Sequence, residues 1–211
     1  MTLDNLLAQQ AGVISRAQAL AAGTSGTTID HRVKARRWQP LYPGVYLAAD
    51  RRPDPADGRD DEVRVRAALL WAGEDALLCG RAAAWWHGMA AEPPPVVGVT
   101  VGRRRRLRRR PGVEVTRREL VAQDCCVPHG LAVTAPPLTV LDAAVELGDD
   151  GAAFLDDALR RSVPFAAVHA AHARYPGSAA APRLLRGAAE RSAHEARRAL
   201  HALLRGAGVG G

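Results

Sequence analysis

Apolar residues near the start of the chain recur at the spacing of short helices. Leu3, Leu6 and Leu7 share one face of the first segment, and Thr2 stands before it as a capping residue. This pattern predicts a helix that runs to about Gln10.

Two more short helices are predicted in the next segment. Ser15 and Gln18 have the spacing of a capping box, in which each side chain bonds the backbone of the other residue. A polar turn then leads to a third helix over 27–36, where Ile29 and Val33 lie four residues apart and face inward.

The spacing changes at residues 38–47, where two short aromatic and β-branched runs flank Pro43-Gly44. Pro followed by Gly suits the centre of a type II turn, so a small hairpin is predicted. Three short helices followed by a hairpin predict a winged helix-turn-helix, whose third helix enters the major groove while the hairpin contacts the backbone. The alternative is a small helical domain whose polar face is simply solvated.

The third helix and the hairpin supply the candidate DNA-binding residues. Short hydroxyl side chains contact phosphates or base edges, and arginine prefers the O6 and N7 atoms of guanine. On this basis the candidates are Ser25, Thr27, Thr28, His31, Arg32, Lys34, Arg36, Arg37 and Tyr42.

Helices and strands alternate beyond a polar segment at 51–60 that contains proline and glycine. Valines at alternate positions indicate half-buried strands at 97–101 and 113–115, which we expect to form a hairpin carrying an arginine-rich loop. The other predicted strands cover 77–78 and 131–133, and the predicted helices cover 61–72, 81–87 and 136–148.

The last third of the sequence is predicted to be helical, over 152–161, 165–174, 180–189 and 192–205. Ser192 and Glu195 have capping-box spacing, which predicts a new helix there. We therefore expect an α+β protein with a winged helix-turn-helix domain at 1–50, a linker at 51–60, a central α/β domain at 61–148 and a C-terminal helical region at 149–211.

The positive charge of the chain is concentrated in one segment. Of the 29 basic residues, 28 are arginine, a bias typical of GC-rich genomes, so arginine content alone says little about nucleic acids. Residues 101–120 hold nine arginines against two glutamates, which equals the whole net charge of +7. This run is a candidate second patch for phosphate or for a protein partner, the alternative being a solvated loop. Its members are Arg103, Arg104, Arg105, Arg106, Arg108, Arg109 and Arg110.

Several classes of protein are not indicated by the sequence. No apolar run reaches the roughly 18 residues typical of a membrane span, and the acidic N-terminus does not look like a signal peptide. Three cysteines, two of them adjacent, suit neither a disulfide framework nor a zinc knuckle, so we expect a cytoplasmic protein. His194 and Glu195 begin a string like the zincin motif H-E-x-x-H, but Arg198 stands where the second histidine is required. The sequence also contains no glycine-rich phosphate-binding loop. We expect no catalytic residue, metal or cofactor.

Several motifs together resemble the AbiEi-type antitoxins, which are transcriptional regulators of type IV toxin–antitoxin systems. The N-terminal elements are GVISRAQAL, T-S-x-x-x-I-x-x-R-V and LYPGVY, and the central ones are ALLCGRAAAWWHGM and GLAVTAPPLTVLDAAVELG. The resemblance covers residues 1 to about 205. It implies a DNA-binding regulator that represses its own toxin–antitoxin operon, with a nucleotidyltransferase-like toxin as its partner.

Two other functions stay open at this point. In longer relatives a helix similar to 192–205 begins a nuclease-like domain, whose acidic metal ligands lie on strands beyond it. The present sequence ends soon after that helix. The second hypothesis is therefore a truncated nuclease-like protein that retains only nucleic-acid binding. The third hypothesis is a protein-interaction module that binds a toxin.

Overall fold

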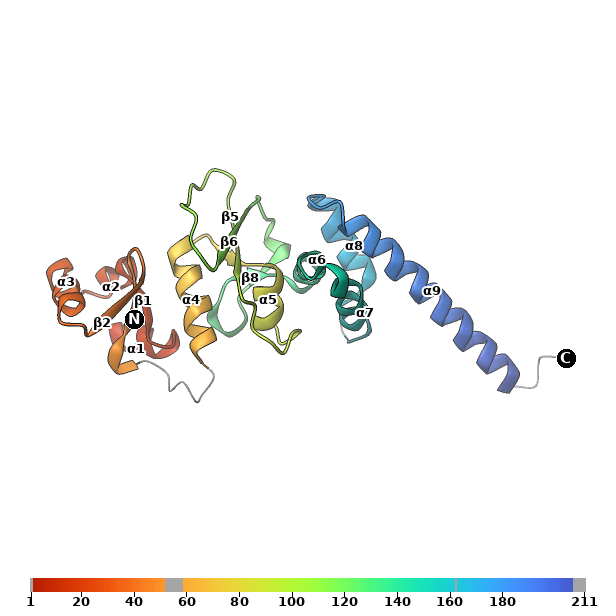
Figure 1. Ribbon diagram of the computed structural model, residues 1–211, viewed down its shortest axis with the longest axis horizontal. Helices are drawn as coiled ribbons and strands as arrows, with labels where there is room; N and C mark the ends of the chain where they lie inside the picture. The colour runs from red at the N-terminus through yellow and green to blue at the C-terminus, as the bar shows by residue number, and fades with distance from the viewer. Residues whose placement is uncertain (1, 52–58, 162, 207–211) are drawn as a thin grey trace. The chain divides into compact units, whose positions relative to one another are not determined.

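The computed structural model describes residues 2–51, 59–161 and 163–206 of the chain. The chain forms two compact units, Met1–Ala135 and Pro136–Gly211. Figure 1 shows helices along the whole chain and strands only in the first unit, where they make two small sheets. The fold is therefore α+β, as predicted, while the division into four parts stays a prediction. Among the described residues, no helix is long and apolar enough to cross a membrane.

The first unit begins with the three short helices that the sequence predicts. They are α1 (Leu3–Gln9), α2 (Arg16–Ala21) and α3 (Gly26–Lys34). The Thr2 side chain accepts a hydrogen bond from the N–H of Asn5, and both bonds of the Ser15–Gln18 capping box are formed. These caps satisfy N–H groups that a helix leaves without partners at its start, which is why the helices begin where they do.

A three-stranded antiparallel sheet completes this segment. It contains β1 (Val13–Ser15), β2 (Trp38–Tyr42) and β3 (Val45–Ala48), in the order β1-β3-β2. The hairpin of β2 and β3 is the predicted one, whereas β1 was not predicted because three residues are too few to show a period. Helices and sheet enclose a common core that includes Leu6, Ile14 and Ile29.

The second sheet has five strands in the order β6-β5-β4-β8-β7. The strands are β4 (Leu77–Leu78), β5 (Val97–Val101), β6 (Val113–Arg117), β7 (Cys125–Cys126) and β8 (Val133–Thr134). Helices α4 (Asp60–Ala72) and α5 (Gly80–Trp86) pack against it, and short 3-10 turns occur at Ala49–Arg51, Ala122–Asp124 and Pro128–Gly130.

The predicted hairpin between β5 and β6 is wrong, because these strands pair in parallel with Val97 opposite Val113. A parallel pair needs a connection that returns along the sheet, and the segment 102–112 is long enough to do so. The expectation of a half-buried β5 is also wrong. All five of its residues are buried, since β5 lies between β4 and β6 and is covered by α4 and α5.

Helix α4 belongs to two apolar clusters at once. Val63 and Ala67 pack with Val13, Val45 and Leu47 of the first sheet. Other α4 residues, including Val65 and Ala68, pack in the core of the second sheet. This dual burial explains why apolar residues lie on more than one face of a helix whose first turn is strongly acidic.

All regular elements in the described part of the second unit are helices. It contains α6 (Pro136–Glu146), a 3-10 turn at Gly148–Asp150, α7 (Gly151–Arg161), α8 (Phe165–Arg174) and α9 (Ala181–Gly206). Gly151 lets α7 approach α6 closely, since a Cβ there would lie 1.9 Å from the carbonyl oxygen of Ala144.

The predicted break between helices at 189 and 192 is wrong, because α9 is continuous. Ser192 lies inside this helix, where its backbone N–H already has an intrahelical partner and needs no cap. Nothing in the Glu190–Ser192 segment breaks a helix, and Arg191 is fixed by two hydrogen bonds to Asp156 of α7, at 2.5 and 2.9 Å. A capping-box spacing therefore marks a helix start only where the preceding residues cannot continue the helix.

Candidate nucleic-acid interface

One face of α3 is exposed and carries polar side chains. Ile29 is fully buried beneath the helix, and this orientation leaves Thr27, His31 and Lys34 exposed at successive turns of the opposite side. The spacing of four and three residues places these three side chains in one row. The row brings three of the predicted DNA-binding residues together on one helical face.

The hydroxyl groups at the start of α3 also hold the helix in place. Ser25 is its N-cap, and its Oγ accepts a hydrogen bond from the N–H of Thr28 at 3.1 Å. The two hydroxyl oxygens, Ser25 Oγ and Thr28 Oγ1, lie 2.8 Å apart in a second hydrogen bond. Both side chains are exposed, so they combine a capping role with a position on the surface.

An ion pair that sequence reasoning missed joins α2 to α3. The guanidinium of Arg16 donates to both carboxylate oxygens of Asp30, at 2.7 and 3.4 Å. The hydrogen bond from Arg16 holds the pKa of Asp30 below its ordinary value, and the same pair raises the pKa of Arg16. The spacing of 14 residues gives no local signal of this contact, which links the exposed surface of α3 to the helix before it.

Arg32 is half-buried and its guanidinium lies over the indole ring of Trp38, 5.1 Å from the ring centroid. A guanidinium in this position gains a cation–π interaction and is held close to the hairpin. The structure thus places Arg32 beside the row of Thr27, His31 and Lys34, with its side chain directed onto β2.

The backbone N–H groups of the two arginines after α3 cap the C-terminal end of the helix. The N–H of Arg36 donates to the carbonyl of Val33, and the N–H of Arg37 donates to that of Arg32. This pair of bonds is a Schellman motif, and it puts Arg36 in the left-handed region at φ = 56°. Both side chains are exposed at the end of α3.

Tyr42 lies apart from the other candidates. Its ring is half-buried and stacks on Trp71 of α4, with centroids 5.6 Å apart and planes 29° from parallel. Burial raises the pKa of its hydroxyl. Its position at the junction of the hairpin with α4 indicates a packing role.

The arginine loop, defined here as Arg103–Arg110, is held at its base by specific bonds. The N–H of Arg103 donates to the Glu119 carboxylate at 2.8 Å, and Arg117 Nε donates to the carbonyl of Arg105 at 3.2 Å. Leu107, in the middle of the run, is half-buried and packs against the core of the second sheet. The loop is therefore anchored, and most of its arginine side chains extend into solvent. The exposed ones are Arg103, Arg104, Arg105, Arg106, Arg108 and Arg109, whereas Arg110 is half-buried.

The described residues contain no group of three or more His, Cys, Asp or Glu side chains that is arranged to hold a metal ion. The exposed surfaces described above are instead rich in hydroxyl, imidazole and guanidinium groups. Such groups donate hydrogen bonds to phosphate oxygens and base edges, which is the chemistry of nucleic-acid binding.

Comparisons with known proteins identify a family and similar solved structures, one of which is described below. The model of the AbiEi antitoxin C-terminal domain matches residues 76–205. No curated protein matches the chain. The crystal structure of the RV2827C protein from Mycobacterium tuberculosis is similar over 88% of this chain and 80% of that one, at 19% identity and a TM-score of 0.39.

Proposed function

Because the chain belongs to the AbiEi antitoxin family, we propose that it is an antitoxin-type regulator that binds operator DNA and represses its own toxin–antitoxin operon. The observation that supports this most is the exposed row of Thr27, His31 and Lys34 on α3. It lies in a segment that precedes the family match, so the DNA-binding proposal rests on the residues themselves.

We interpret the segment from α1 to β3 as a winged helix-turn-helix. In this interpretation α2 and α3 are the helix pair, α3 enters the major groove and the β2–β3 hairpin is the wing. The Arg16–Asp30 ion pair and the Ser25 cap support it, because both fix the helix that must read the bases. Thr27 and His31 would contact base edges, and Lys34, Arg36 and Arg37 would contact phosphates.

The arginine loop is proposed as a second contact to the DNA backbone. The guanidinium groups of Arg108 and Arg109 are exposed and form no ion pair within the described part of the chain. Several like charges held close together repel one another unless an anion lies among them, and a phosphate backbone supplies evenly spaced anions. A cognate nucleotidyltransferase-like toxin is the protein partner that family membership favours.

The test is operator binding by variants of the α3 row. Replacing Thr27 and His31 by alanine should weaken binding to the chain's own promoter by about 1–3 kcal/mol for each base that is no longer recognised, with little effect on a scrambled duplex. Fluorescence anisotropy with both duplexes measures this difference. Gln9→Ala, an exposed change on α1, is the matched control and should leave both affinities unchanged.

Two results would contradict the proposal. If the double variant binds its promoter as tightly as the parent chain, α3 is not the recognition helix. If binding to both duplexes falls equally, the row contributes charge or general contact but does not read sequence. Lys34→Gln is expected to give that second pattern, which makes it a useful internal reference.

A further inference from the structure

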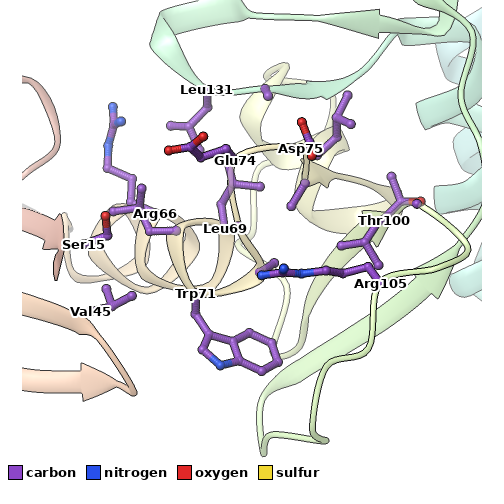
Figure 2. Close-up of a pocket in the computed structure, with 18 of the residues that line it drawn as sticks. Ser15, Val45, Arg66, Leu69, Trp71, Glu74, Asp75, Thr100, Arg105 and Leu131 are labelled. Atoms are coloured by element: carbon purple, nitrogen blue, oxygen red, sulfur yellow. The ribbon is translucent and has the colours of Figure 1, made fainter. Parts of the chain in front are cut away.

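A cavity of about 1240 Å³ lies within the first unit, beside the carboxyl end of α4 and the arginine loop. Figure 2 shows Arg105 extending from the loop toward the end of α4, with Thr100, Glu74 and Asp75 also on the cavity lining. Small-molecule sites in proteins typically occupy about 300–1,000 Å³, so this cavity is large enough for a ligand of several rings or groups.

On the lining of this cavity, the guanidinium of Arg105 lies against Gly73. Gly73 ends α4 with φ = 113°, and a Cβ there would lie 3.0 Å from a terminal nitrogen of Arg105. Any larger residue would therefore displace this side chain. Arg16 and Arg66 also line the cavity, but each is already paired with a carboxylate. Arg104 and Arg105 form no ion pair in the described chain, so their charge is available to an anion.

A buried hydroxyl lies beside this lining. The Thr100 side chain is only 1% exposed, and its hydroxyl has no hydrogen-bond partner among the described residues. The hydroxyl oxygen is itself inaccessible to solvent, so a ligand in the cavity would reach it only after neighbouring side chains move. Thr100 lies on β5, one residue before the strand ends and the loop begins.

We propose that this cavity binds a nucleotide. The phosphate groups would lie at Arg104 and Arg105, because guanidinium groups bind phosphate through paired hydrogen bonds. The carboxylates of Glu74 and Asp75 are exposed on the same lining and accept hydrogen bonds from ribose hydroxyls or base amino groups. The indole of Trp71 and the side chain of Leu69 supply apolar lining for the base.

Isothermal titration of the full chain with ATP, in the absence of DNA, tests the proposal separately from operator binding. Saturable binding is expected, and Arg105→Gln should weaken it at least tenfold. Arg108→Gln removes the same charge from the same loop at a residue outside the cavity lining, so it should change affinity less than twofold.

Three results of this titration decide between a nucleotide, phosphate alone and general attraction to charge. No saturable binding at millimolar ATP overturns the proposal, as does an equal weakening in Arg105→Gln and Arg108→Gln, which would indicate attraction to charge in general. Inorganic tripolyphosphate is the second probe. If it binds as tightly as ATP, the lining recognises phosphate alone and the nucleotide assignment is wrong, whereas weaker binding supports contacts to ribose and base.

Discussion

At the scale of single residues, Arg36 combines an unfavourable backbone conformation with an exposed cationic side chain. The left-handed region costs a non-glycine residue roughly 1–2 kcal/mol, and glycine is the usual occupant of this position in a Schellman motif. We expect Arg36→Gly to raise the free energy of unfolding by up to about 1 kcal/mol, because the relief of strain is partly offset by the greater freedom of glycine in the unfolded chain. The same change should weaken binding to all DNA sequences similarly, because it removes a cation that would bind phosphate.

Urea unfolding and anisotropy titrations measure these two effects on one variant. Arg37→Gly is the matched control, since Arg37 is not in the left-handed region and glycine there should lower stability. Arg36→Gln removes the charge and keeps the strain, so it should reproduce only the weaker DNA binding. A decrease in stability for Arg36→Gly would contradict the strain argument.

At the scale of elements, the capping box of α2 determines where the helix pair begins. Ser15 accepts from the N–H of Gln18 at 3.1 Å, and the Gln18 side chain accepts from the N–H of Ser15 at the same distance. Replacing Ser15 by alanine should lower the free energy of unfolding by about 1 kcal/mol. Ser15→Asp keeps an acceptor at the cap and should retain most of the stability. Chemical denaturation of both variants is the measurement, and equal decreases would show that the cap is not what stabilises this start.

At the scale of the whole molecule, the uneven distribution of charge has a measurable consequence for DNA binding. Replacing four exposed loop arginines by glutamine should flatten the dependence of log K on log salt by about 0.9 for each phosphate that is no longer bound. The four positions are Arg103, Arg106, Arg108 and Arg109, which leaves in place the two loop arginines that line the cavity, Arg104 and Arg105. Stability should change by less than about 0.5 kcal/mol, because these side chains are solvated.

A second quadruple variant separates local contact from net charge. It carries glutamine at four exposed arginines of α9, namely Arg183, Arg186, Arg197 and Arg198. If the loop contacts phosphate, only the loop variant flattens the salt dependence. Equal slopes of log K against log salt in the two variants would indicate that the loop is a solvated segment without phosphate contacts. If the loop variant still binds DNA but no longer captures the toxin, the arginine loop is instead a protein-binding surface.

Local signals were sufficient for the elements at the start of the chain. Thr2, Ser15 and Gln18 act on N–H groups within three residues of themselves, so their spacing alone predicts where α1 and α2 begin. The inward face of α3 follows from Ile29 and Val33 in the same way. The exposed row on α3 was predictable as well, because the buried face of a regular helix fixes the opposite one.

Sequence by itself also located the arginine run between two valine-rich strands, but only the tertiary structure decided that those strands are parallel. The direction of β6 depends on whether the segment 102–112 turns back at once or returns along the sheet before pairing, and no residue near the loop carries that information. The same limit applies to the Arg16–Asp30 pair, to Tyr42 on Trp71 and to the cavity beside Thr100. Each of these depends on burial between segments that lie far apart along the chain, whereas caps, helical faces and charge runs depend on neighbours within about one helical turn.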